Sequence, residues 1–201
     1  MGKLKTVLAF VVLLPISAIA QGPSSDLMPE KATGNFAPLN KKALAGETRS
    51  QLQLGIAFEF GQGVDKNLEE AMHWYRIAAE QGDPIAQTNL GYFYETGVGG
   101  PASPTEAAKL YLRASVSGFV RAQFNLGTLY LRGAGVERND EVAAHWISQA
   151  ADAGCPTAMA ALGRLYADGV GVPRDEQKAR ELIRKAAKKH DPRLCTRYGK
   201  Q

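Results

Sequence analysis

Glycines recur along this chain at a constant step of 36 residues. One series follows a leucine or tyrosine, and a second series supplies a Gly-x-Gly pair six and eight residues later. The first series is Gly55, Gly91, Gly127, Gly163 and Gly199, and the pairs are Gly61/Gly63, Gly97/Gly99, Gly133/Gly135 and Gly169/Gly171. A period in the thirties is typical of solenoids, in which two-element units stack on their neighbours.

The repetition of the Gly-x-Gly pair argues against a phosphate-binding loop. Such a loop occurs once, after a strand and before a helix. Here the preceding segments carry apolar residues at helical spacing, as in Leu90/Tyr94 and Leu126/Tyr130. A glycine just past a helix end supplies the left-handed conformation of a C-cap. The pairs are therefore predicted to end helices.

A second helix follows each pair and begins with its own cap. The predicted N-caps are Asn67, Ser103, Asn139 and Asp175. Ser103 and Glu106 have the spacing of a capping box, with Pro104 at the first helical position. The segments that follow repeat small and bulky apolar residues with a 3.6-residue period. We expect two helices in every unit and no strands.

The unit resembles the Sel-one-like repeat (SLR), a relative of the tetratricopeptide repeat. The third unit, 120–155, shows the pattern in full at Ala122, Leu126, Gly127, Tyr130, Gly133, Gly135, Val136, Asn139, Ala143, Trp146, Ala150, Ala151 and Gly154. The resemblance covers about residues 49–199. It implies an all-α fold, a right-handed α-solenoid of about four 36-residue helix-pair repeats, with short capping helices at both ends. It also implies scaffolding or protein–protein binding as the general role, and it does not imply a catalytic site.

The chain divides accordingly into eight segments. Lys3 and Lys5, the apolar run 7–14 and the sequence Ala18-Ile19-Ala20 form the three-part pattern of a secretory signal peptide. The predicted division is a signal peptide (1–20), a flexible leader (21–37), a capping half-repeat (38–48), four repeats (49–83, 84–119, 120–155 and 156–191) and a capping helix (192–201).

Charge is uneven along the mature chain. Loss of two lysines with the signal peptide leaves 22 basic against 20 acidic residues, a net charge of +2. Residues 174–201 contain ten basic and four acidic residues. This basic end suits an acidic partner or an anionic lipid or polymer, but the interpretation we favour is a solvated capping helix. Nucleic acid is not an expected ligand of an exported protein.

No constellation of catalytic residues is present in the sequence. His73 and His145 occupy equivalent positions two repeats apart, too far to share a metal with bonds of about 2 Å. Nucleophile elbows, paired-histidine metal motifs and Cys-x-x-Cys are missing. We therefore expect no enzymatic activity, no metal and no cofactor.

The two cysteines, Cys155 and Cys195, leave two interpretations open. Export to an oxidising compartment and an even count favour a disulfide. However, the positions are separated by one repeat and four residues, and a disulfide needs Cα atoms about 4.4–6.8 Å apart. Cys195 also aligns with Gln87, Gln123 and Met159, as an ordinary core residue would.

The resemblance also suggests where a partner binds. In related helix-pair solenoids the first helix of each unit lines the concave wall. The wall positions by register are Leu52, Gln53, Ile56, Glu59, Thr88, Asn89, Tyr92, Glu95, Arg121, Phe124, Asn125, Thr128 and Arg164. Their chemistry varies between units, as a ligand-binding surface allows. Tyr92 and Phe124 are candidate hot spots, and the Asn89 and Asn125 amides suit an extended peptide backbone.

These observations favour an exported scaffold of the bacterial cell envelope, in the periplasm, that binds a protein or peptide partner on its concave face. The chain alone is expected to be a monomer without a transmembrane segment after signal cleavage. Two alternatives stay open at this point: an enzyme or accessory protein acting on cell-wall or surface polymer, and a secreted factor that meets host proteins.

Overall fold

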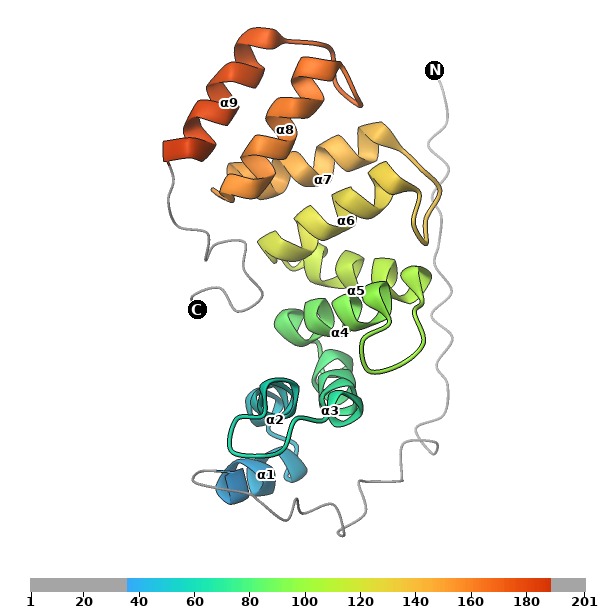
Figure 1. Cartoon of the computed structure of the whole chain (residues 1–201), viewed down its shortest axis with the longest axis vertical. Helices are drawn as coiled ribbons and strands as arrows, with labels where there is room; N and C mark the ends of the chain where they lie inside the picture. Colours follow the sequence, from blue (N-terminus) through green and yellow to red (C-terminus); the bar gives the residue numbers. More distant parts are fainter. Residues whose placement is uncertain (1–35, 189–201) are drawn as a thin grey trace, which may run out of the picture. The chain divides into compact units, whose positions relative to one another are not determined.

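The computed structural model describes residues 36–188, and these fold into helices joined by short turns and loops (Figure 1). The helices are α1 (Phe36–Leu44), α2 (Thr48–Phe60), α3 (Leu68–Glu80), α4 (Pro84–Thr96), α5 (Pro104–Val116), α6 (Val120–Arg132), α7 (Asp140–Asp152), α8 (Pro156–Asp168) and α9 (Glu176–Lys188). The eight helices from α2 to α9 are each 13 residues long. Within residues 36–188 there is no strand, so the predicted all-α class is confirmed.

The helices pack in the order of the sequence. The largest contacts join α2 to α3, α4 to α5, α6 to α7 and α8 to α9, and each pair then contacts the next. Figure 1 shows the same succession from α1 to α9. Helix α1 packs on α2. The described helices therefore form a solenoid of four helix pairs, preceded by one additional helix.

The glycine after leucine in each first helix allows close packing within a pair. A Cβ added to Gly91 would lie 2.6 Å from the Tyr111 ring, and one added to Gly127 would lie 2.6 Å from Cγ1 of Ile147. Real Cβ atoms do not approach so closely. The 36-residue glycine series thus marks the point where α4 meets α5 and α6 meets α7.

The Gly-x-Gly pairs end the first helices, as predicted. Gly133 has a φ of 62° and donates its N–H to the Leu129 carbonyl, which is a left-handed C-cap. The second glycine has a different role. A Cβ on Gly135 would overlap the Pro104 backbone, and one on Gly171 would overlap the Asp140 backbone. Each of these loops therefore rests on the first turn of the preceding unit's second helix.

The caps of the second helices agree with the sequence in three cases out of four. Asn67, Asn139 and Asp175 each accept hydrogen bonds from main-chain N–H groups two or three residues later. Ser103 stands at the N-cap of α5, but its side chain makes no cap hydrogen bond. Glu106 instead forms an ion pair with Lys109. The predicted capping box is therefore wrong.

Glutamines link successive units in a way that the sequence analysis did not foresee. The Nε2 atoms of Gln51, Gln87 and Gln123 donate to carbonyl oxygens at the end of the preceding second helix. The acceptor of Gln51 is Ala43 in α1, at 3.2 Å. Helix α1 therefore holds the place of a second helix. It begins at Phe36, two residues before the predicted half-repeat, and the predicted capping helix 192–201 lies outside the described residues.

Candidate functional site

The thirteen predicted wall residues all lie on first helices, but they differ widely in exposure. Gln53 and Arg164 are exposed, whereas Leu52, Glu59, Thr88 and Asn89 are buried. The remaining seven are half-buried: Ile56, Tyr92, Glu95, Arg121, Phe124, Asn125 and Thr128. The accessible part of the predicted wall is therefore smaller than the sequence suggests.

Several predicted wall side chains take part in the internal structure. The Thr88 hydroxyl donates to the Pro84 carbonyl at 2.7 Å, and the Thr128 hydroxyl donates to the Phe124 carbonyl at 3.0 Å. Leu52 belongs to the apolar core of the first units. Partner binding by these residues stays a prediction. Their internal contacts already account for the presence of a hydroxyl at Thr88 and Thr128 and of an apolar side chain at Leu52.

Two carboxylates of the wall accept hydrogen bonds from buried tyrosines. The Tyr75 hydroxyl donates to Glu59 at 2.7 Å, and the Tyr111 hydroxyl donates to Glu95 at 2.9 Å. The second carboxylate also accepts from Arg132 at 3.0 Å. Each tyrosine lies 16 residues after its glutamate, so the pairs tie a first helix to the second helix of the same unit.

Tyr111 is completely buried, and its hydroxyl is hydrogen-bonded to the Glu95 carboxylate. Burial of the ring raises the pKa of its hydroxyl well above 10, and the charge of Glu95 and the hydrogen bond to it act in the same direction. Arg121 and Asn125 act in the opposite direction. The structure thus brings three predicted wall residues, Glu95, Arg121 and Asn125, together around one buried tyrosine. The repeat pattern in the sequence singles out neither Tyr111 nor Arg132 as a site residue.

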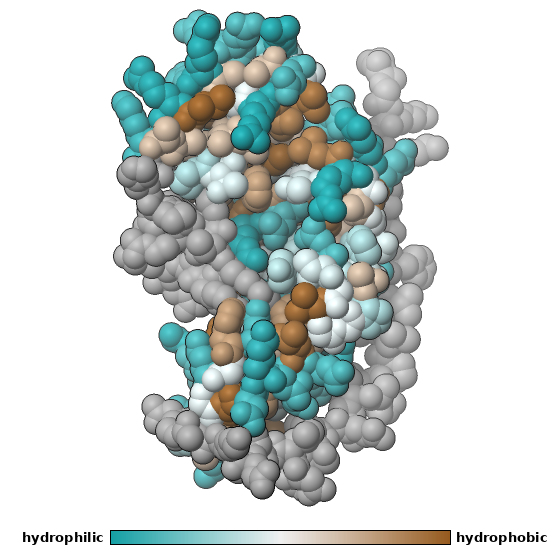
Figure 2. Space-filling model, viewed as in Figure 1, coloured by the Kyte–Doolittle hydropathy of each residue, from teal (hydrophilic) through white to brown (hydrophobic). Residues whose placement is uncertain are grey.

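The later units lack this polar pair. Leu131 and Ile147 stand at the positions of the glutamate and the tyrosine in the third unit, and Ala167 and Ile183 in the fourth. Tyr92 packs against the core of the first units, and Phe124 packs against the core of the last ones. Figure 2 shows apolar side chains in separate patches among polar ones on the face in view. Among the described residues, the Tyr–Glu hydrogen bond is therefore confined to the first two units.

Within residues 36–188, no three His, Cys, Asp or Glu side chains are grouped so that they could hold a metal ion. The rings of His73 and His145 each pack edge-on against the neighbouring tryptophan, with centroids 5.5 and 5.4 Å apart. None of the helices in this part of the chain is long and apolar enough to cross a membrane.

Cys155 occupies a structural position. It is completely buried at the N-cap of α8, where its sulfur accepts a hydrogen bond from the Ala158 N–H at 3.3 Å. Its predicted partner, Cys195, lies outside the described residues. The disulfide therefore stays a prediction.

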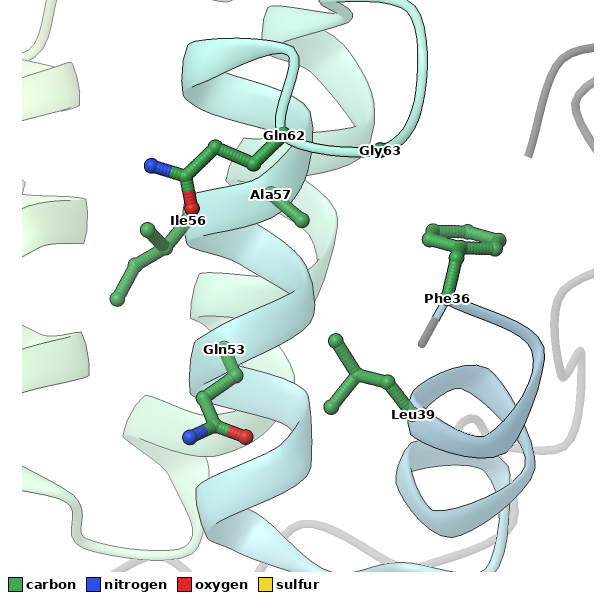
Figure 3. A pocket seen from close by; sticks show the side chains of 7 residues that line it. All are labelled: Phe36, Leu39, Gln53, Ile56, Ala57, Gln62 and Gly63. Atoms are coloured by element: carbon green, nitrogen blue, oxygen red, sulfur yellow. The ribbon is translucent and has the colours of Figure 1, made fainter. Parts of the chain in front are cut away.

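A groove between α1 and α2 contains a cavity with a mainly apolar lining (Figure 3). The cavity has a volume of about 450 Å³ and is lined by Phe36, Leu39, Gln53, Ile56, Ala57, Gln62 and Gly63. A second cavity of about 410 Å³ shares Leu39 and Gln53 with the first and adds Pro38, Lys42, Glu47, Arg49 and Ser50. Two of the predicted wall residues, Gln53 and Ile56, thus line the first of these cavities.

Comparisons with known proteins agree with this architecture. The Sel1 repeat family model matches residues 48–83, 84–118, 120–155 and 156–191. A crystal structure of c5321, a protective antigen of uropathogenic Escherichia coli strains with an SLR fold, is 37% identical over 79% of this chain, with a TM-score of 0.76. A Sel1 repeat protein from Oxalobacter formigenes is 34% identical over 79% of the chain, with a TM-score of 0.71.

The matched region spans 34% of the E. coli protein and 65% of the O. formigenes protein. No curated protein matches the chain. Four consecutive family matches cover well over half of the sequence, and they coincide with the four helix pairs α2–α3, α4–α5, α6–α7 and α8–α9. The chain therefore belongs to the Sel1 repeat family.

Proposed function

We propose that this protein is an exported, non-enzymatic scaffold that binds a protein or peptide partner along the first helices of its repeats. Sel1 repeat proteins are generally protein-interaction scaffolds. The single observation that carries the proposal is the contrast within the repeat. Glycine, alanine and capping positions recur because they pack the units, whereas the first-helix positions between them change from unit to unit.

The half-buried part of the wall has the composition of a binding surface. Tyr92, Arg121 and Phe124 are of the residue types that dominate binding energy at protein interfaces. Glu95 and Asn125 add a carboxylate and an amide beside them. Such a mixture favours a polypeptide partner with both apolar and polar side chains.

The proposal extends to export. The three-part pattern in residues 1–20 supports cleavage after Ala20 and a mature chain that begins at Gln21, in the periplasm or outside the cell. N-terminal sequencing of the protein from its native host tests this directly. A cytosolic protein that retains residues 1–20 contradicts it.

The binding surface is tested with two matched double variants. Tyr92→Ala with Phe124→Ala removes the aromatic side chains of the wall, and Arg76→Ala with Lys109→Ala removes exposed side chains of second helices. Crosslinking in the native cells first identifies the partner, and affinity is then measured with the purified pair. We expect the aromatic variant to weaken binding by about 2 kcal/mol or more, roughly 30-fold, and the control variant to change it little.

Thermal unfolding of both variants accompanies the binding measurement, because Tyr92 and Phe124 also pack against the cores. A folded aromatic variant with undiminished affinity contradicts the wall proposal. Loss of binding in the Arg76/Lys109 variant alone would move the binding surface to the second helices.

A further inference from the structure

The groove between α1 and α2 has chemically different ends. The cavity of about 450 Å³ at one end is lined mainly by apolar groups, including Phe36, Leu39 and Ile56. The adjoining cavity of about 410 Å³ is lined by charged groups, namely Lys42, Arg49 and Glu47. Cavities of several hundred Å³ with an apolar lining and a few polar groups are typical of ligand sites.

The groove lies on a face of α1 that no described first helix covers. Lys42 stands at the repeat position of Ala78, Ala114 and Ala150, and all three alanines are completely buried. In complete units this face of the second helix lies against the unit's own first helix, as the contact of Tyr75 with Gly55 shows. Among the described residues, no first helix precedes α1. Its lysine is accordingly exposed, whereas the alanine at this position is completely buried in the first three helix pairs and half-buried, as Ala186, in the fourth.

The charged end of the groove attracts anions. Lys42 and Arg49 are exposed, and within residues 36–188 neither forms an ion pair. Glu47 is also exposed and leaves this end with one net positive charge. The first turn of α2, with Ser50 in the lining, adds unpaired N–H groups and the positive end of a helix dipole. The Glu47 side chain makes no cap hydrogen bond to them.

The two ends have a defined separation along α2. Arg49, Gln53 and Ile56 follow one another on a single face of the helix, at spacings of four and three residues. Seven residues of α-helix span about 10 Å. A polyproline II segment places side chains three residues apart on the same side, about 9 Å from each other. The groove therefore matches a peptide in which an apolar and an acidic residue are separated by two others.

From this match we propose that the α1–α2 groove binds a peptide segment of the partner in which a large apolar side chain is followed three residues later by a carboxylate. The apolar side chain enters the cavity between Leu39 and Ile56, and the carboxylate pairs with Lys42 and Arg49. Gln53, which lines both cavities, faces the intervening main chain. The inference rests on the proposed scaffold function and names the class of segment that it recognises.

The probe is the synthetic peptide acetyl-Leu-Pro-Pro-Glu-amide, in which the prolines favour the required conformation. It is titrated into the isotope-labelled protein, expressed from the full-length sequence, and followed by NMR chemical shifts. We expect saturable shifts at residues of α1 and α2. Replacement of the glutamate by lysine, or of the leucine by glycine, is expected to abolish saturation.

Variants of the protein separate the groove from general charge effects. Lys42→Gln and Arg49→Gln are each expected to weaken binding about threefold, and about tenfold together, as exposed charge pairs do. Gln53→Glu places a negative charge in the groove and is expected to weaken binding at least as much. Lys41→Gln is the matched control, because Lys41 is an exposed lysine of α1 outside both linings. It is expected to leave the affinity unchanged.

Three results overturn the inference: no saturable binding, equal binding of the lysine-containing peptide, or shifts that map outside α1 and α2. Equal losses in the Lys41 and Lys42 variants overturn it as well. The scaffold proposal is judged separately by capture of the native partner. If capture depends on Tyr92 and Phe124 but not on Lys42 and Arg49, the scaffold stands and the groove inference fails.

Discussion

Replacement of Gly127 by alanine sets two opposing effects against each other within one helix. Alanine favours the interior of a helix over glycine by about 1 kcal/mol. In α6, however, the new Cβ would lie 2.6 Å from Cγ1 of Ile147 and 3.0 Å from the Ala143 carbonyl oxygen. Ile147 is 1% exposed, so its side chain has no free space to move into.

The balance of these effects gives the expected magnitude. Forcing extra atoms into a packed core costs about 1–3 kcal/mol. Separation of α6 from α7 by nearly 1 Å belongs at the upper part of that range, and the gain in helix propensity offsets about 1 kcal/mol of it. We therefore expect Gly127→Ala to lower the free energy of unfolding by about 1–2 kcal/mol.

Gly163→Ala is the matched control at the far end of the described solenoid. Its Cβ would lie 2.9 Å from Cγ1 of Ile183 and 3.1 Å from the Ala179 carbonyl oxygen, both slightly longer than at Gly127, and Ile183 is 45% exposed and can rotate away. We expect a change within about 0.5 kcal/mol of zero, because the remaining strain and the helix propensity nearly cancel.

Urea unfolding of both variants, followed by circular dichroism, provides the measurement, with equal slopes required for a direct comparison of midpoints. In the double variant Gly127→Ala with Ile147→Ala, the smaller side chain at 147 removes the clash. The loss of stability in the double variant should therefore be smaller than the sum of the losses in the two single variants. A Gly127→Ala variant that is more stable than the wild type would refute the reasoning, because helix propensity alone would then decide the outcome.

Other positions give further predictions that can be measured in the same way. Asn139→Ala should cost about 1 kcal/mol because it removes a cap hydrogen bond of α7, whereas Ser103→Ala should cost almost nothing, and equal losses would contradict the observed caps. Gly135→Ala should cost about 3 kcal/mol or more, since it adds left-handed strain to an overlap with the Pro104 backbone, and a tolerated alanine would contradict that contact. Above pH 10 the unfolded state loses the Tyr111 proton while the folded state, with its raised pKa, keeps it. The free energy of unfolding should therefore fall as the pH rises above 10, and this part of the slope should be missing in Tyr111→Phe; an unchanged slope would contradict the pKa shift.

Much of the fold could be predicted because the same residue types recur at equivalent positions in four repeats. A single Gly-x-Gly is ambiguous, but four in register identify a C-cap such as Gly133. The second glycine of each pair was harder to interpret, because its reason is a contact with the previous unit. Gly135 lies against the backbone of Pro104, 31 residues earlier, and no local pattern reveals that contact.

The candidate site was less predictable for a related reason. Register assigned Glu95 to a wall, but only the three-dimensional structure shows that it accepts a hydrogen bond from Tyr111 of the same unit. The hydrogen bonds of the glutamine series could not be predicted from the sequence. The role of Gln87 becomes clear only when the structure shows that its side chain donates to the Ala79 carbonyl. The α1–α2 groove lies where no described helix precedes α1, and the repeat pattern of the sequence does not reveal such a feature.

The central claim is that the first helices, and not the second helices, hold the partner. Photo-crosslinking in the native cells tests it most directly, with a photoreactive amino acid placed at the exposed wall positions Gln53 or Arg164, or at the exposed second-helix position Arg113. The account predicts one discrete crosslinked partner from Gln53 and Arg164 and none from Arg113. Crosslinking of the same partner from Arg113 alone would contradict it.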